Sequence, residues 1–451
     1  MLASSCGFDS YLDYYDGAER VWYFGKGWCQ IRYMPRLSDY RGKLEEIPYD
    51  FHELLGALAP RPLFVNAPLH DSNFRWKSVD QCAAAEALVY GQLQSGGWTN
   101  SIDFDPRGKV ALYRNGKGRG KNNSSLDDGQ TQSAIRFLVL ADKALGFRNK
   151  KIHESAEFAL KALLAAQFAN GGFPQVWTGP VGQQRITKAS YPDYDWQTEG
   201  RIKNYWDMYT LNDNVCGYVA DTLIDAYRVY DDEQYKTALR RFGDFLLLAQ
   251  MPEPQPAWAQ QYNYEMQPIW ARKFEPPGIS GDESQEVIET LITIYNITGD
   301  RKYLEPLPRA LAYLKRSVLP DGQLARYYEL DTNKPLYMVR RADVYTLTYD
   351  DSKLPKHYGW KTESRLRELE KKYDELIHTT DPLRSPPRAP SERLIRQIIT
   401  GLDGEGRWVS VYNGERLVGQ AKFKQGERYI SSEVFGRNLT PLSDYLIATA
   451  D

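Results

Sequence analysis

Residues 260–283 (QQYNYEMQPIWARKFEPPGISGDE) combine aromatic, basic and acidic side chains without helical or strand periodicity. Aromatic faces such as those of Tyr264 and Trp270 suit sugar rings, and the planar guanidinium of Arg272, next to Lys273, suits a carboxylate. A long polar loop between two amphipathic helices is more typical of a ligand-binding loop than of a spacer. The alternative is that the aromatic side chains form the core of the loop and Arg272 makes a surface ion pair.

The composition narrows the class of partner. The chain has 451 residues and a net charge of −2, which favours two or three domains and argues against nucleic acid or a membrane surface as partner. Its 32 tyrosines and 11 tryptophans are compatible with a carbohydrate-binding surface. No transmembrane run and no signal peptide are recognised, so we expect a cytoplasmic protein or a chain that has lost its start. The four cysteines lack metal-type spacing and are expected to be free, mostly buried thiols: Cys6, Cys29, Cys82 and Cys216.

The first 80 residues differ from the rest. Residues 62–68 (PLFVNAP) predict a buried parallel strand, and His70 and Asp71 follow it. This segment resembles the late part of an α/β-hydrolase of the carbohydrate-esterase kind. That fold places the acid of its catalytic triad on the loop after this strand, where His70 and Asp71 lie. The segment supplies neither the GxSxG motif that carries the nucleophile nor the catalytic histidine, and acyl transfer requires both. We therefore predict that residues 1–80 are an inactive remnant or a fusion scar, with a working esterase as the alternative.

A repeated pattern begins near residue 78. Three predicted helices end in Gln92, Gln167 and Gln250, and each leads into a glycine- or proline-rich turn with an aromatic residue. Helical hairpins repeating at this spacing predict a mainly α fold, an incomplete α/α toroid with its site at one rim, and an ordinary helical solenoid is the alternative. The expected helices cover residues 132–145, 154–167, 215–230, 234–250, 283–298 and 301–316.

The predicted layout has three parts: the segment 1–80, a catalytic toroid over 81–360 and an extension over 361–451. The extension opens with a charged helix (SRLRELEKKYDELI), followed by a proline- and arginine-rich link, short strands or a hairpin, and a last helix from Leu442. We expect it to pack against the toroid, and its residues suggest no chemistry.

Four motifs occur in order within the toroid. They are LDDGQT (126–131), NGGFPQ (170–175) with TLNDN (210–214), WARKFEP (270–276) with GDES (281–284), and ARYYE (325–329) with TNKPLY (332–337) and Arg340. Together they resemble the motifs of the family 10 pectate lyases over roughly residues 80–345.

This resemblance implies roles for individual residues. Asp127 and Asp213 match active-site acids of that family, with Ca²⁺ bridging protein and substrate carboxylate, and Asp128 lies beside them as a further candidate ligand. Arg272 and Arg326 match arginines that bind uronate groups. Arg340, fourteen residues after Arg326, matches the arginine proposed to abstract the proton. The remaining candidate substrate-binding residues are Trp270, Lys273, Tyr264 and Lys334.

The chain departs from the family pattern in four places. Asp128 replaces an asparagine, residues 178–208 form a longer connection, and Lys334 stands where arginine is common. The sequence after Arg340 is only loosely similar. We expect these departures to change which substrate is bound more than the type of reaction.

The residues suit β-elimination, in which a proton leaves the carbon next to a uronate carboxylate. Calcium and arginine offset the carboxylate charge and so acidify that carbon. Closely placed carboxylates can supply calcium ligands, although Asp127, Asp128 and Asp213 can also be read as helix N-caps. Neutralising an arginine base costs about 7–8 kcal/mol near neutral pH, so Arg340 either abstracts the proton or only binds the substrate while another group, such as a tyrosine or Lys334, does so.

The predicted function is a polysaccharide lyase that cleaves polygalacturonate or a related uronate polymer with the help of Ca²⁺. One alternative is an inverting glycoside hydrolase, which needs an acid–base carboxylate pair, with Glu275, Glu283 and Asp213 as candidates. The other is a carbohydrate-binding protein without turnover. The substrate suggests a secreted or periplasmic location.

Overall fold

The computed structural model describes the larger part of the chain, which is helix-rich as expected. It forms two compact units, one of Met1–Leu354 with Trp360–Tyr373 and one of Pro355–Gly359 with Asp374–Asp451. The described residues are 2–5, 11, 14–31, 34–47, 63–66, 85–104, 107–199, 203–342, 344–378, 390–404, 407–413, 423–430, 434, 437, 438, 441, 442 and 445.

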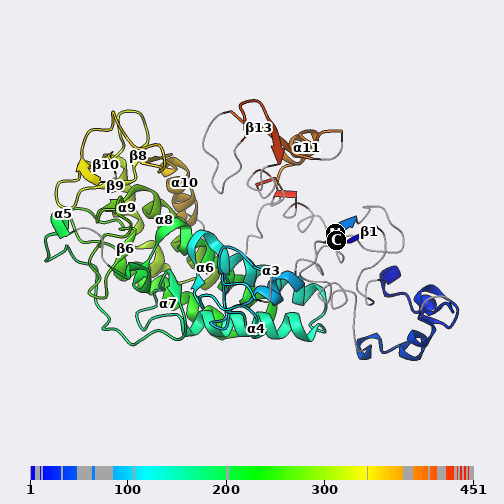
Figure 1. The fold of residues 1–451 in the computed structure, drawn as a ribbon. Coiled ribbons are helices and arrows are strands. Elements are labelled where there is room, and N and C mark those ends of the chain that lie inside the picture. Colours follow the sequence, from blue (N-terminus) through cyan, green and yellow to red (C-terminus); the bar gives the residue numbers. More distant parts are fainter. Residues whose placement is uncertain are drawn as a thin grey trace. The chain divides into compact units, whose positions relative to one another are not determined.

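Pairs of helices follow one another along the first unit (Figure 1). Helix α3 packs against α4 and α6, α6 against α7 and α8, and α8 against α7 and α9. Thus α3, α6 and α8 form a row, with a second helix beside each of them. The bounds are α3 Gln130–Ala144, α4 Lys150–Ala165, α6 Val215–Tyr230, α7 Glu233–Ala249, α8 Gly281–Thr298 and α9 Leu307–Arg316.

These helices agree with the apolar periodicity of the sequence, with one difference. The helix expected over 301–316 is divided into a 3-10 turn, η9 (Arg301–Leu304), and α9. Pro306 and Pro308 lie at the start of α9, where a missing backbone N–H is tolerated. Inside a continuous helix the same prolines would each remove a hydrogen bond.

The three glutamines that close the predicted units make the same contacts in each unit. The side-chain amide of Gln92 donates to the carbonyl oxygens of Gly96 (3.0 Å) and Ser155 (2.9 Å). Gln167 donates to Gly171 and Ala238 at 3.0 and 2.9 Å. Gln250 likewise donates to Pro256 and Pro306 at 2.9 and 3.2 Å. Each amide therefore ties its own turn to the second helix of the following hairpin, which confirms the repeat.

A second repeated contact fixes the turns to the row of helices. The backbone N–H and C=O of Trp98 both bond to Thr131 Oγ1 on α3, at 3.0 and 3.1 Å. The backbone of Trp258 makes the same pair of bonds to Ser284 Oγ on α8, at 3.0 and 3.1 Å. Gly171 in the second turn has a φ of +95°, and a Cβ there would lie 1.8 Å from the carbonyl oxygen of Arg241, so only glycine fits.

Short strands lead into the row helices and hold their N-terminal ends together. Two antiparallel pairs join β3 (Ser124–Ser125) to β4 (Val176–Trp177) and β5 (Tyr209–Thr210) to β6 (Gln261–Tyr262). A four-stranded sheet has the order β11-β10-β9-β7, and β12 pairs with β8. These strands are β7 Ile279–Ser280, β8 Leu324–Ala325, β9 Tyr327–Tyr328, β10 Pro335–Arg341, β11 Val344–Thr348 and β12 Lys361–Thr362.

The long connection over 178–208 contains α5 (Trp196–Glu199) and the 3-10 turn η7 (Tyr205–Asp207). Its side chains and backbone contact the 255–270 loop: Tyr194 Oη donates to Pro268 O at 2.6 Å, and Gln261 Nε2 donates to Tyr205 O at 2.7 Å. The connection therefore packs on the loop formed by residues 260–283.

Near the N-terminus, β1 (Leu2–Ser5) pairs in parallel with β2 (Leu63–Asn66). The predicted parallel strand is thus confirmed, whereas His70 and Asp71 lie outside the described residues. Short 3-10 turns follow β1 and enclose a small core around Trp22, Cys29 and Leu37. The turns are η1 Tyr14–Gly17, η2 Glu19–Trp22, η3 Gly27–Cys29, η4 Pro35–Tyr40 and η5 Leu44–Glu46.

The charged helix expected after residue 361 is α10 (Leu366–His378). In the second unit, α11 (Glu392–Thr400) precedes an antiparallel hairpin of β13 (Val409–Val411) and β14 (Arg428–Ile430). The expected hairpin is confirmed by the strands VSV and RYI, which overlap the expected segments RWVSVYNG and YISSEVF. Most of the expected segment LVGQAKF, of the link and of the last helix lies outside the described residues. Cys29 and Cys216 are free and buried, as expected. Within the described chain, no helix combines the length and apolarity that a membrane span requires.

Candidate active site

Two similar turns place aspartates at the N-terminal ends of neighbouring helices. Turn η6 (Asp127–Gly129) precedes α3, and turn η8 (Asn212–Asn214) precedes α6. The second residue of each has a positive φ, 49° at Asp128 and 48° at Asp213. Aspartate and asparagine tolerate this left-handed conformation better than most side chains. Asp213 therefore corresponds to Asp128 in the repeat, and Asn212 corresponds to Asp127.

Neither predicted aspartate caps a helix. The N-cap of α6 is Asn214, whose Oδ1 accepts the N–H of Gly217 at 3.2 Å, and the N-cap of α3 is Gly129. The alternative reading of Asp127 and Asp213 as helix caps is therefore wrong, and their carboxylates are directed to side chains.

An asparagine links the two carboxylates. Asn212 Nδ2 lies 2.6 Å from Asp213 Oδ2 and 3.5 Å from Asp127 Oδ1, which also accepts Gln175 Nε2 at 2.7 Å. The two motifs that were separated by more than 80 residues in sequence are thus joined in one site.

Burial and like charges disfavour the ionised aspartates. Burial raises the pKa of Asp127, and the negative charges of Asp213 and Asp128 raise it further, against the hydrogen bond from Gln175. Burial also raises the pKa of Asp213, although the positive charges of Arg326 and Arg272 oppose the shift. A cation placed among these carboxylates would relieve the repulsion.

Arg326 lies between β8 and β9, and its side chain is only 11% exposed. Its Nη1 is 2.8 Å from Asp282 Oδ2, and its Nη2 is 2.6 Å from Glu283 Oε1 and 3.5 Å from Asp213 Oδ1. Three carboxylates therefore surround the guanidinium that was predicted to bind a uronate group. The structure shows Arg326 holding the aspartate turn against α8.

A further buried carboxylate supports the same turn. Glu286 Oε2 accepts the backbone N–H of Asn214 at 3.1 Å. Burial and the neighbouring charges of Glu283 and Asp282 raise the pKa of Glu286. Burial raises the pKa of Glu283 as well, despite the opposing charge of Arg326. More carboxylates than cations face this cluster, which favours the protonated forms of Glu283 and Glu286.

Arg272 is more accessible, with a side chain 43% exposed. It pairs with the buried carboxylate of Glu275, whose Oε2 also accepts the N–H of Arg272 at 2.9 Å, and it lies 5.2 Å over the ring of Phe274. Burial alone would raise the pKa of Glu275, but the hydrogen bond and charge of Arg272 outweigh it and lower that pKa overall. The charge of Arg272 acts to lower the pKa of both Asp127 and Asp213.

Arg340 and Lys334 occupy a hairpin beside this cluster. Arg340 is exposed on β10, donates from Nε to Ala342 O at 2.9 Å and lies 5.7 Å over the ring of Tyr345. Lys334 is exposed and lies 5.0 Å over the ring of Tyr349. Tyr345 contacts Phe274 at 5.4 Å between ring centroids, which connects the hairpin to Arg272.

The other candidate residues of the 260–283 loop have different surroundings. Trp270 is 4% exposed and donates from Nε1 to Trp196 O at 2.5 Å. Tyr264 is half-buried, contacts Phe168 and Tyr209, and donates to Asp207 O at 3.0 Å. Lys273 is exposed. The charges of two residues of this loop act on Asp213: that of Arg272 lowers its pKa and that of Glu275 raises it.

The cluster fits calcium in chemical type. Carboxylate and side-chain amide oxygens are hard donors, and in the described part of the chain Gln175 Oε1 and Asn212 Oδ1 are buried without a hydrogen-bond partner. Among those same residues, no group of three acidic, histidine or cysteine side chains is arranged to hold a metal alone. A bound calcium would therefore take further ligands from water or from substrate.

Sequence reasoning missed several residues that organise the site. Gln175 closes the NGGFPQ motif and Asn212 directly precedes Asp213, so both were within recognised motifs. Glu286 lies two residues after GDES and four residues after Asp282, so one turn of α8 places it beside Asp282. The role of Tyr345 has no sequence signal, because it depends on the register of the β10–β11 hairpin.

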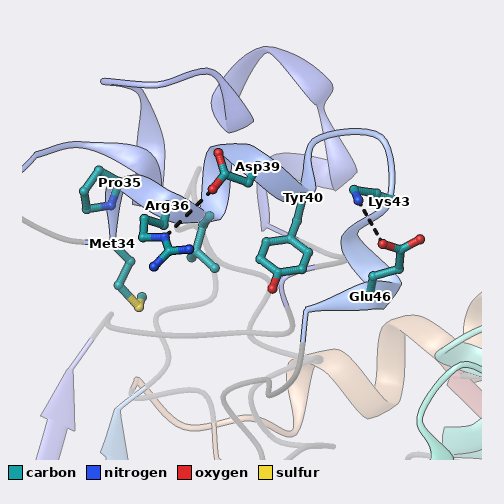
Figure 2. Close-up of a pocket in the computed structure, with 8 residues that line it drawn as sticks. Met34, Pro35, Arg36, Asp39, Tyr40, Lys43 and Glu46 are labelled. Atoms are coloured by element: carbon teal, nitrogen blue, oxygen red, sulfur yellow. Dashed lines mark ion pairs between the residues drawn. The ribbon is translucent and has the colours of Figure 1, made fainter.

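A separate pocket of about 810 Å³ lies in the N-terminal segment, along η4 and η5 (Figure 2). Its charged lining residues pair locally, Arg36 with Asp39 at 4.0 Å and Lys43 with Glu46 at 3.0 Å. None of the predicted site residues lines it.

Comparison with known proteins bears on residues 92–299, which match the family model described as pectic acid lyase. Two similar solved structures are the family 10 polysaccharide lyase from Cellvibrio cellulosa and a point mutant of it in complex with trigalaturonic acid. The native lyase is 21% identical to this chain, and the match covers 66% of this chain and 92% of the lyase, with a TM-score of 0.49. The mutant is 20% identical, and its match covers 66% of this chain and 93% of the mutant, also with a TM-score of 0.49. The cellobiose 2-epimerase from Spirochaeta thermophila has 12% identity, covers 59% of this chain and 56% of its own, and has a TM-score of 0.35. No curated protein matches.

The family match, together with the acid–arginine cluster at the ends of repeated hairpins, supports a polysaccharide lyase. Residues 92–299 match the pectic acid lyase model, which confirms the resemblance predicted from the motifs.

Proposed function

We propose that the protein cleaves polygalacturonate or a related uronate polymer by calcium-assisted β-elimination. The observation that carries this proposal is the link between Asp127 and Asp213 through Asn212 at the N-terminal ends of α3 and α6, with the charge of Arg272 acting on both carboxylates. Half-buried carboxylates that repel one another, next to an accessible guanidinium, suit a cation and an anionic sugar. We also propose that the hairpins belong to an incomplete α/α toroid, with a hydrolase remnant before it, and that the protein acts outside the cytoplasm.

Calcium would be held by Asp127 and Asp213, with Asp128 beside them. When bound, it would offset the charge of the uronate carboxylate and so acidify the adjacent carbon. The chain itself keeps Asp127 and Asp213 in place through Gln175, Asn212 and the α8 carboxylates. Because these residues are already fixed, little reorganisation is required when the substrate arrives.

Arg272 would bind the carboxylate of the reacting uronate. Its guanidinium is fixed on one side by Glu275 and Phe274 and is still 43% exposed. Such a cation stabilises the negative charge that develops as the proton leaves. Arg326, surrounded by three carboxylates, would instead act by positioning Asp213.

We assign Arg340 to substrate binding rather than to proton abstraction. The carbonyl of Ala342 and the ring of Tyr345 both favour its protonated form. An arginine base would need surroundings that favour the neutral form, because its free pKa is about 12.5 or higher.

The glycoside hydrolase alternative has less support. A general acid needs a raised pKa and access to the sugar. Glu275 is 2% exposed with a lowered pKa, and Glu283 is 1% exposed and paired with Arg326. Both carboxylates are therefore occupied by arginines. Asp213 has a raised pKa and a side chain that is 31% exposed, but neither of the other two candidates is an accessible partner for it.

The test is incubation with polygalacturonate, with calcium or with EDTA, while ultraviolet absorption of unsaturated ends is recorded. We expect absorption with calcium and none with EDTA. Asp213→Asn keeps a side chain that tolerates the positive φ and removes the charge, so it should abolish turnover with an unchanged circular dichroism spectrum. Reducing ends without ultraviolet absorption would identify a hydrolase instead.

A further inference from the structure

One loop of the first repeat concentrates positive charge. Residues 106–126 contain six cations and no acidic residue, although acidic residues outnumber lysine and arginine by 59 to 57 in the whole chain. The cations lie within residues 107–121, which we call the basic loop, and none of the predicted site residues is among them. All six are exposed: Arg107, Lys109, Arg114, Lys117, Arg119 and Lys121.

The basic loop has a defined backbone despite its glycines. The N–H of Tyr113 donates to Lys117 O at 3.0 Å, and the N–H of Gly120 donates to Ala111 O at 3.1 Å. Gly118 is buried with a φ of +77°, and a Cβ there would lie 2.1 Å from Ala111 O. Glycine is therefore required where the two arms of the loop meet. The cations project from a closed turn, whose position is fixed by backbone hydrogen bonds.

The charges at the tip of the basic loop are not neutralised locally. Lys117 lies 5.4 Å over the ring of Tyr90, which is a neutral support. Across the part of the chain that the structure describes, no carboxylate forms an ion pair with Lys117, Arg119 or Lys121. An exposed group of like charges raises the local concentration of anions, so this surface favours an anionic partner.

The basic loop lies at the end of the helix row that carries the aspartate turns. Lys121 is six residues before Asp127, which separates them by at most about 20 Å. Between them, Ser124 on β3 accepts the N–H of Gly97 at 2.8 Å, and the next residue of that turn, Trp98, bonds to the start of α3. A polymer bound at Asp127 would thus need only a short further stretch to reach the basic loop.

Charge and position together indicate one occupant. We propose that the basic loop is a second, non-catalytic binding site, which anchors another stretch of the uronate chain that occupies the aspartate turns. Once one stretch is bound, the second contact forms within the same complex, so a long chain binds more tightly than a short one without any new contact at the reacting sugar. The proposal rests on the proposed function and adds to it a dependence on chain length.

The experiment compares polygalacturonate with trigalacturonate, which is short enough to occupy the aspartate turns alone. Lys117→Gln, Arg119→Gln and Lys121→Gln are combined in one variant. Its KM for polygalacturonate should rise about tenfold, the factor expected from three exposed ion pairs, with kcat unchanged. Its KM for trigalacturonate should equal that of the native protein.

The matched control combines Lys143→Gln, Arg148→Gln and Lys150→Gln. These residues are also exposed and also comprise two lysines and one arginine, but they lie between the C-terminal end of α3 and the start of α4. Both KM values of the control should be unchanged, although its net charge falls equally. If the basic-loop variant unfolds, Arg119→Gln alone should raise KM for polygalacturonate about twofold.

The anchoring site is overturned if the basic-loop variant changes KM for polygalacturonate no more than the control does. It is also overturned if KM for trigalacturonate rises by the same factor, because the loop would then belong to the catalytic site.

Calorimetric binding of polygalacturonate separates this proposal from the proposed function. A native protein that binds the polymer without forming unsaturated product contradicts the proposed function, while weaker binding by the basic-loop variant than by the control would still support the anchoring site. A native protein that does not bind the polymer overturns the anchoring site as well.

Discussion

Arg326 and Arg340 are fourteen residues apart, yet their charges are held in opposite ways. Arg326 is 11% exposed among the carboxylates of Asp213, Asp282 and Glu283. Arg340 is exposed on a hairpin, over an aromatic ring and beside a backbone carbonyl. The first arginine is neutralised by its surroundings and stabilises the fold, whereas the second is exposed on the hairpin, where we propose that it binds substrate. Similar motifs can therefore place one arginine inside the fold and another at its surface.

The largest expected effect is on Arg326. Arg326→Ala leaves the buried carboxylates without their cation, so it should lower the free energy of unfolding by about 3–5 kcal/mol. Urea denaturation measures this loss. A loss below about 1 kcal/mol would show that the acidic cluster does not depend on Arg326, and the comparison with Arg340 would fail.

Arg340→Ala should leave stability within about 0.5 kcal/mol of the native value, because the side chain is exposed. Loss of one charge-assisted contact should raise KM for polygalacturonate about tenfold or more. Arg340→Lys should recover part of this loss with an unchanged pH–rate profile. A large fall in kcat for the alanine variant, with a profile displaced toward neutral pH for the lysine variant, would instead identify Arg340 as the base.

High salt should weaken the contribution of Arg340 to substrate binding more than the contribution of Arg326 to stability. Exposed charges are screened at high ionic strength, since the Debye length falls from about 10 Å at 0.1 M to about 3 Å at 1 M. KM of the native enzyme should therefore rise with NaCl, and the difference between native protein and Arg340→Ala should shrink. The stability difference between native protein and Arg326→Ala should persist at the same salt concentrations.

A pH-dependent effect concerns Glu286, whose pKa burial raises. Between the unfolded and folded pKa values the folded protein binds more protons, so native stability falls as pH rises above about 4.3, by at most about 1.4 kcal/mol per pH unit. Glu286→Gln cannot titrate and can still accept the N–H of Asn214. Its stability should decrease less with pH than that of the native protein, as thermal unfolding from pH 5 to 8 would show. Parallel curves would mean that Glu286 is charged in the folded state.

Much of the fold follows from sequence because its signals are local and repeated. The apolar spacing of α3, α6 and α8 and the glutamines at 92, 167 and 250 identify the hairpins. The division between η9 and α9 also has a local cause, the prolines at 306 and 308.

The sequence predicts which residues form the site better than it predicts the contacts between them. The motifs identify Asp127, Asp213 and Arg272, which the structure brings together. They do not show that Arg326 is neutralised, because its partners Asp282 and Glu283 come from another helix and depend on tertiary packing. The burial of Trp270 likewise depends on the 178–208 connection, which packs against it.

The glutamine contacts also have a consequence for folding cooperativity. Each of Gln92, Gln167 and Gln250 bonds both to its own turn and to the second helix of the following hairpin. Opening one turn therefore breaks a bond that the neighbouring hairpin shares, as in a chain of nearest-neighbour coupled units. Backbone amide hydrogens of these turns should exchange with solvent at the same rate as those of the adjacent helices. The loops that carry the site should therefore have the same free energy of opening as the helices of the repeat.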